Sequence, residues 1–250
     1  MTIACGIISG FHATQSPIVA RTMTKEHHAR PTFFGMMVAE GLIAMIWAAA
    51  ALAIYNIDPA NLKLSGPVVL GNITTHFLGR WMGGVTVFAI VVLAITSGDT
   101  ALRSARLSIS EMFSIDQVKL LTRIMTCLPL ILIVSLLLWW SNLSAKTFNN
   151  LWNYFAWGNQ ILSVTTLMAG TVWLIKEEKK YASLVTLLPG MFMTMVVFTF
   201  ILWTPGKDGM PIGIVPGGIS MAASVLISMF MSLIFAFWVI RRGRSLCALS

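Results

Sequence analysis

The chain of 250 residues is 57% hydrophobic and only 10% charged, whereas about 25% of the residues of an average soluble protein are charged. This composition excludes an ordinary soluble domain and predicts an all-α polytopic membrane helix bundle in contact with lipid. The net charge of +8 does not indicate a nucleic-acid partner, because the basic residues stand in short segments between apolar runs and not on one soluble face.

The first apolar run, residues 3–20, is interrupted by polar residues. Pro17 lacks an N–H, and its ring clashes with the preceding turn of a helix. Freed backbone groups are costly in hydrocarbon, so we predict a discontinuous span whose polar groups bind a small-molecule substrate, as in secondary transporters. The alternative is a kinked helix with polar groups bonded to its neighbours. The expected substrate contacts are Ser9, Gly10, Phe11, His12, Thr14, Gln15 and Ser16.

Further apolar runs are long enough to cross a bilayer, which takes about 20 residues. Within 56–80 we expect a short helix on the outer surface, and we expect the third span to continue as a helix over 99–113. Alternate loops hold 13 of the 17 Lys and Arg residues, which places those loops and the tail 241–250 in the cytoplasm. With the first run, seven spans are predicted, the others being 33–55, 83–97, 121–140, 148–175, 184–203 and 219–240.

Two ionisable residues inside these runs are candidates for carrying a coupling proton. Glu40 lies about 10 Å inside the second span at a rise of about 1.5 Å per residue. A carboxylate at this depth is a candidate proton site, and the alternative is an ion pair near the interface. His12 either carries a proton, because imidazole exchanges protons near neutral pH, or serves as a packed hydrogen-bonding partner.

The inner end of the third span gathers hydroxyl groups and one carboxylate. Thr96, Ser97, Asp99 and Thr100 offer oxygen ligands of the kind that a hard cation such as Na⁺ prefers. The alternative is that Asp99 pairs with Arg103, four residues on, while the hydroxyls bond back to their own helix.

Amide side chains follow one stripe of the span 148–175, at Asn149, Asn153 and Gln160. Amides often join membrane helices, and this interpretation is favoured over substrate contact; Asn153 and Gln160 remain candidate substrate contacts. The sequence contains no nucleophile and base at a recognisable spacing and no nucleotide-binding loop. We therefore expect neither an enzyme nor a metal or cofactor.

Several motifs resemble the carbon starvation protein A (CstA) family over essentially the whole chain. They are Gly-Phe-His-Ala-Thr-Gln-Ser-Pro at 10–17, Arg-Pro-x-Phe-Phe-Gly at 30–35, Ala-Glu-Gly at 39–41 and Thr-Ser-Gly-Asp-Thr-Ala at 96–101. The resemblance implies a multi-pass transporter of the bacterial inner membrane that takes up peptides, or pyruvate in some members, when carbon is scarce. With the candidate proton and cation sites, this predicts symport with H⁺ or Na⁺.

Members of that family are longer, and the chain resembles only their later part. By analogy, the order of broken helix, span, short outer helix and hydroxyl-rich span resembles the second inverted repeat of a LeuT-type transporter. On this analogy we expect a separately encoded N-terminal half as a partner. The alternative is a non-transporting membrane subunit or a truncated remnant.

Overall fold

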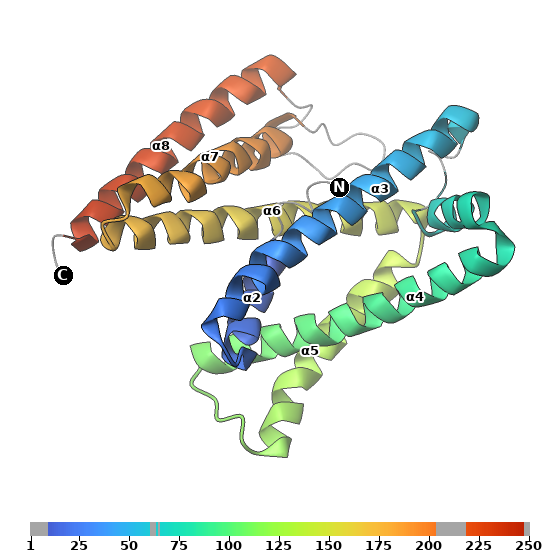
Figure 1. Ribbon diagram of the computed structural model, residues 1–250, viewed down its shortest axis with the longest axis horizontal. Coiled ribbons are helices and arrows are strands. Elements are labelled where there is room, and N and C mark those ends of the chain that lie inside the picture. The colour runs from blue at the N-terminus through green and yellow to red at the C-terminus, as the bar shows by residue number, and fades with distance from the viewer. Residues whose placement is uncertain (1–9, 61–63, 65, 204–218, 248–250) are drawn as a thin grey trace. The chain divides into compact units, whose positions relative to one another are not determined.

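The computed structural model describes residues 10–60, 64, 66–203 and 219–247, which are helical apart from short connections and contain no strand. The prediction of an all-α protein is confirmed for this part of the chain. The elements, shown in Figure 1, are α2 (Gly10–Thr22), η1 (Glu26–His28), η2 (Arg30–Gly35), α3 (Met36–Ile57), α4 (Gly66–Met112), α5 (Leu120–Ser141), α6 (Ala145–Lys176), α7 (Lys180–Trp203) and α8 (Met221–Cys247).

Five helical segments of the described chain are long and apolar enough to cross a membrane. Two further predicted spans are not among these five segments. The predicted span 148–175 lies in α6, which has 32 residues but carries several amides in its first half. The predicted span 3–20 overlaps the helix α2, which has only 13 residues. The predicted LeuT-like arrangement is not supported. The five segments are Glu26–Ile57, Gly66–Met112, Leu120–Ser141, Tyr181–Trp203 and Met221–Cys247.

The helix α2 is continuous from Gly10 to Thr22 and contains Pro17. The predicted interruption between Gly10 and Pro17 is therefore wrong, while Ser9 and the rest of the run 3–9 lie outside the described residues. Pro17 removes one helical hydrogen bond, the one to the Ala13 carbonyl oxygen, and one missing bond does not unwind the helix. The next carbonyl oxygen, that of Thr14, accepts a hydrogen bond from the Ser104 hydroxyl over 2.7 Å.

The chain forms two compact units, which are described separately. Among the described residues, the first unit holds 14–139 and the second holds 10–13 and 140–247. The first therefore contains η1, η2, α3, α4 and nearly all of α5, and the second contains α6, α7 and α8.

In the first unit, α4 consists of two helices, 66–78 and 80–112, joined at Gly79. Gly79 has φ 74° and ψ 175°, a conformation that is open essentially to glycine alone. Beyond the turn, Gly83 approaches the first helix so closely that an added Cβ would stand 3.0 Å from the Thr74 carbonyl oxygen. The predicted short helix and third span are thus the two arms of a tight helical hairpin.

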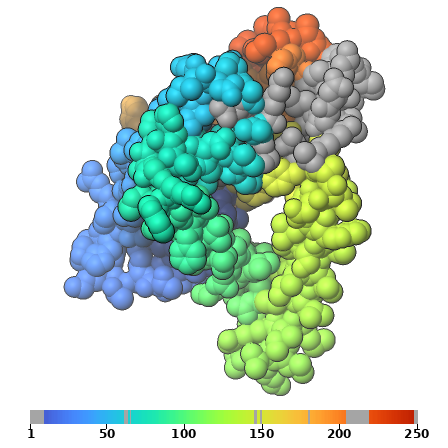
Figure 2. Space-filling view, turned by 90° about the vertical axis from the view of Figure 1, so that its right-hand side faces the viewer, coloured from blue at the N-terminus to red at the C-terminus, as the bar shows by residue number. Residues whose placement is uncertain are grey.

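The long helices of the first unit bury little apolar surface. None of the most apolar stretch of α4 is buried, and 6% of that of α5 is buried. Figure 2 shows α5, in lime green, uncovered along much of its length. The first unit therefore leaves most of its apolar side chains available to lipid or to other helices.

In the second unit, the three helices α6, α7 and α8 share one core, and small residues bring their backbones close together. The Ser232 hydroxyl of α8 donates to the Met191 carbonyl oxygen of α7 over 2.8 Å. The Thr171 and Thr186 hydroxyls join α6 to α7 at 2.8 Å. A row of buried small residues along α8, the serine seam, faces these contacts; it comprises Ser224, Ser228, Ser232 and Ala236. The apolar core comprises Val164, Met168, Leu187, Met193, Val197, Ala236 and Val239.

Candidate functional site

The first turn of α2 packs against the middle of α6. Gly10 is buried, and a Cβ added to it would stand 2.5 Å from the Asn159 carbonyl oxygen and from the Leu162 Cβ. The Phe11 backbone N–H donates to the Asn159 side-chain oxygen over 2.9 Å. An amide side chain of α6 thus binds the backbone of α2 across the helix contact. Only glycine allows this close approach.

This junction, Gly10 and Phe11 with Asn159, joins two segments that are predicted to contribute separately to the site. Gly10 and Phe11 were predicted substrate contacts, and Asn159 precedes the predicted contact Gln160. Asn159 itself was not among the predicted site residues. An amide within an apolar run was the available signal, but its partner lies 148 residues away.

The other amides of α6 have different surroundings. Asn153 and Gln160 are half-buried, and the Gln160 carbonyl oxygen accepts a hydrogen bond from the Ser163 hydroxyl over 2.7 Å. The Asn150 side-chain oxygen is buried without a hydrogen-bonding partner among the described residues. The side chain of Asn149 lies outside the described residues. Whether Asn153 and Gln160 contact substrate stays a prediction.

The remaining polar residues of α2 that were predicted to bind substrate, His12, Thr14, Gln15 and Ser16, are half-buried. The Gln15 side-chain nitrogen is buried and donates to no acceptor among the described residues. An unpaired buried N–H costs about 1–3 kcal/mol. Substrate contact by these four residues stays a prediction.

Glu40, the candidate proton carrier of the second span, is exposed near the start of α3. The π-helix η2 leads into α3, and the Met36 backbone N–H donates to the Pro31 carbonyl oxygen, five residues earlier. Such π stretches are rare and are frequent at functional sites. This one covers the Arg-Pro-x-Phe-Phe-Gly motif.

At the predicted cation site, the side chains bond within their own helix. The Thr96 hydroxyl donates to the Leu93 carbonyl oxygen and the Thr100 hydroxyl to the Thr96 carbonyl oxygen, each over 2.9 Å. The Asp99 carboxylate pairs with Arg103 at 3.1 Å. This is the arrangement of the alternative interpretation. Cation binding by Thr96, Ser97, Asp99 and Thr100 stays a prediction.

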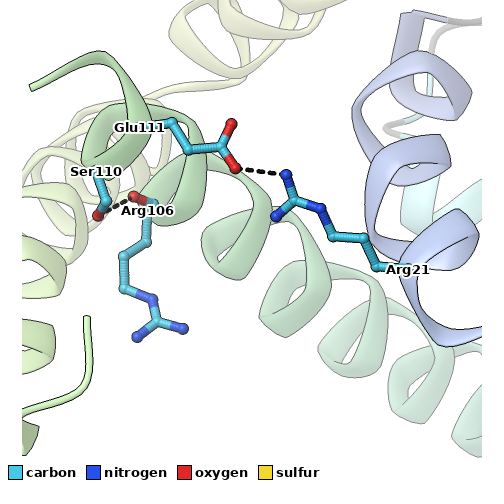
Figure 3. A network of polar contacts seen from close by, with 4 residues as sticks. All are labelled: Arg21, Arg106, Ser110 and Glu111. Carbon is cyan, nitrogen blue, oxygen red and sulfur yellow. Dashed lines mark hydrogen bonds and ion pairs between the residues drawn. The ribbon is translucent and has the colours of Figure 1, made fainter. Parts of the chain in front are cut away.

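An ion pair joins the end of α2 to the end of α4 in the first unit, next to a hydrogen bond within α4. The Arg21 guanidinium lies 2.6 Å from the Glu111 carboxylate, and the Ser110 hydroxyl donates to the Arg106 carbonyl oxygen over 2.7 Å (Figure 3). The Arg21 and Glu111 side chains are 63% and 61% exposed. Exposed ion pairs contribute about 0–1 kcal/mol, so this pair positions the helix end without stabilising it strongly.

Comparison with known proteins decides the family. The sequence profile described as "Carbon starvation protein CstA" matches residues 1–77 and 67–200. The chain belongs to the CstA family. This confirms the resemblance seen in the motifs, and it places the α2 and α6 junction inside the part that matches the CstA profile.

Two relatives of this CstA chain come from Haemophilus influenzae. An "Uncharacterized protein" is 38% identical over 122 residues, which cover 48% of this chain and 82% of the relative. An "Uncharacterized membrane protein" is 49% identical over 55 residues, which cover 22% of this chain and 15% of the relative. No solved structure matches the chain. With five apolar helices in the described residues, the CstA chain is a multi-pass membrane protein.

Proposed function

We propose that this chain is part of a secondary active transporter that imports peptides or pyruvate across the bacterial inner membrane. Membership of the CstA family supports a role in the response to carbon starvation. The single observation that carries the location of the site is the junction of α2 with α6, where the Phe11 N–H meets the Asn159 side chain. The basic loops support a cytoplasmic C-terminus.

Pyruvate and peptides each carry a carboxylate, which accepts hydrogen bonds from amide side chains. Asn159 of α6 holds Gly10 and Phe11 of α2 in place, and further amides follow along α6. We infer that the substrate carboxylate binds beside this junction and that Asn153 and Gln160 line its path.

We assign the coupling of substrate uptake to proton or cation movement to the ionisable and hydroxyl groups predicted from the sequence. His12 or Glu40 would exchange the coupling proton, or Thr96, Ser97, Asp99 and Thr100 would bind the coupling cation. Replacing Glu40 by Gln removes the titrating group and keeps the shape. In a complete transporter we expect E40Q to abolish proton-driven uptake; uptake that keeps its wild-type dependence on external pH would remove Glu40 from the mechanism.

The proposal includes a partner chain that covers the exposed apolar helices of the first unit. The most apolar stretches of α4 and α5 are 0% and 6% buried. A separately encoded N-terminal half would supply further helices to cover these faces. The same exposure favours the second candidate function, a membrane subunit that binds other helices and does not itself transport.

Uptake of radiolabelled pyruvate and of a labelled tripeptide distinguishes the two functions. Cells would express the chain alone, or together with an N-terminal half taken from a longer CstA protein. The transporter proposal expects uptake above background with both parts. No uptake in either case, with both chains shown to be in the membrane, would favour the non-transporting subunit.

A matched pair of glycine variants tests the site itself. Gly10→Ala places a methyl group against the Asn159 carbonyl oxygen, whereas a Cβ at Gly158, the neighbour of Asn159 on α6, meets no atom within 4 Å. We expect G10A to lose at least about 1.4 kcal/mol, or tenfold, of uptake efficiency, and G158A to keep it. Equal uptake by the two variants would place the substrate elsewhere.

A further inference from the structure

The connection between α4 and α5 brings two arginines to one glutamine. Arg106, near the end of α4, donates to the Gln117 side-chain oxygen over 3.4 Å. Arg123, in the first turn of α5, donates through Nε to the Gln117 backbone carbonyl oxygen over 2.6 Å. The Gln117 side-chain nitrogen donates in turn to the Thr126 hydroxyl of α5 over 3.4 Å. Arg106 and Arg123 are called the arginine pair below, and both belong to the first unit.

Neither guanidinium of the arginine pair has a carboxylate partner among the described residues. The acidic residues of α4 and of the following loop are engaged elsewhere. Glu111 is paired with Arg21. Asp99 is paired with Arg103. Asp116 accepts a hydrogen bond from a backbone N–H of its own loop over 3.0 Å. Two guanidiniums held at one residue repel each other, and a bound anion would remove this repulsion.

The arginine pair keeps most of its hydrogen-bond donors for a ligand. A guanidinium carries five N–H donors in a planar fork, and within the described part of the chain each arginine gives one of them to Gln117. Because Arg123 uses its Nε, its two terminal nitrogens remain for an oxyanion, and such a fork matches a phosphate group. Figure 3 shows the Arg106 side chain extending away from Glu111. Arg123 is exposed and Arg106 is half-buried, so the pair can be reached from the surface.

The apolar side chains beside the arginine pair indicate which kind of anion binds. Val118, Leu120 and Leu121 are 79%, 71% and 69% exposed, and only 6% of the most apolar stretch of α5 is buried. The basic residues of this loop belong to the set predicted to lie on the cytoplasmic side, so the loop stands at the end of a span, at the depth of lipid phosphates. A soluble anion would contact the arginines alone, whereas a phospholipid contacts the arginines and the apolar side chains together.

We propose that the arginine pair binds the phosphate of an anionic phospholipid of the cytoplasmic leaflet, whose acyl chains lie along the first turns of α5. Three cations, the pair and Lys119, stand against one anion, Asp116, so the loop has two positive charges in excess. This excess favours an anionic lipid over a zwitterionic one. The lipid takes only the cytoplasmic end of α5 and leaves the rest of the helix for a partner chain. This assignment is independent of the transported substrate.

Protection from phenylglyoxal, which modifies accessible guanidiniums, tests the assignment on the unaltered chain. The purified chain in detergent would receive phosphatidylglycerol, phosphatidylcholine or soluble glycerol phosphate before the reagent, and mass spectrometry would follow the modification of each arginine. We expect phosphatidylglycerol to slow the modification of Arg106 and Arg123 by about tenfold, the effect of a hydrogen bond to a charged group. Arg241, an exposed arginine of α8, should keep its rate, and the other two additives should protect the pair far less.

A matched set of variants measures the affinity by native mass spectrometry of bound phosphatidylglycerol. Arg106→Gln with Arg123→Gln removes the pair, and we expect binding to weaken by about tenfold or more. Arg241→Gln with Arg242→Gln removes the same charge from exposed positions of α8, and binding should be kept. Arg106→Lys with Arg123→Lys retains the charge and loses the fork, so its affinity should lie between those of wild type and the double glutamine variant.

Several outcomes would overturn the proposal. Equal losses in the two double glutamine variants would mean that overall positive charge attracts the lipid. Equal protection of the pair by glycerol phosphate would assign the site to a soluble anion, and protection by an acidic peptide but not by the lipid would assign it to a protein partner. Elution volume and helical circular dichroism establish that each variant is folded, and the protection measurement needs no variant.

Discussion

The two units of the chain contain equally apolar helices but pack them very differently. In α7 and α8 of the second unit, 28% of the most apolar stretch is buried, whereas in α4 of the first unit none is buried. Apolar side chains gain nothing by leaving lipid for another helix, so helices associate in membranes through close packing and hydrogen bonds. The second unit has both, in its serine seam and in the Thr171–Thr186 contact.

The first unit lacks such a seam among its described residues and is held by a few specific contacts. They include the Gly79 turn with Gly83 against Thr74, the Ser104 bond to α2 and the Arg21–Glu111 pair. Hydrophobicity thus identifies a span, while small residues at regular spacing identify which spans pack together.

The largest effect is expected from filling the serine seam. Ser228 is fully buried on α8, and S228L would force the three helices apart. Overpacking of a core typically costs about 1–3 kcal/mol and occasionally more; because Ser228 has no exposed surface, we expect the upper end of this range or above it, and a fall of several degrees in the thermal midpoint of the purified protein. Met229→Leu, at the adjacent exposed position, is the control. A stable S228L protein would show that the seam does not hold the second unit together.

An intermediate effect is expected at the turn of the first unit. Gly79→Ala puts a Cβ on a backbone with positive φ, which costs about 1–3 kcal/mol, although the added atom meets nothing within 4 Å. Gly84→Ala, inside the following helix, should be neutral or slightly stabilising because alanine favours helix. Amide hydrogen exchange over residues 66–90 measures the difference. Faster exchange in G84A than in G79A would contradict the assigned turn.

The smallest effect is expected from the ion pair of the first unit. A double-mutant cycle with Arg21→Ala and Glu111→Ala should give a coupling free energy below about 1 kcal/mol, because both side chains are more than half exposed. Salt screens such pairs, so the coupling should vanish at about 1 M salt. A coupling of several kcal/mol that resists salt would mean that the pair is buried in the membrane-embedded protein.

Local features of this fold were predictable from the sequence, and contacts across long separations were not. The apolar runs predicted the helices α3, α5, α7 and α8. The spacing of four residues predicted the Asp99–Arg103 pair as one of two alternatives. Pro17 was expected to interrupt its helix, which it does not, because a single missing bond is tolerated. The meeting of Phe11 with Asn159 could not be read from either segment alone. The seam on α8 was readable as a small residue at every fourth position but was not used.

The π stretch Arg30–Gly35 affects how the following helix α3 is rotated about its axis. A π stretch accommodates one residue more than an α-helix of the same path, and each residue of an α-helix turns the chain by about 100°. Deleting one residue between Pro31 and Gly35 would restore ordinary winding and rotate the whole of α3 by about that angle. Glu40 would then face another side of the helix, although its depth along the axis would hardly change.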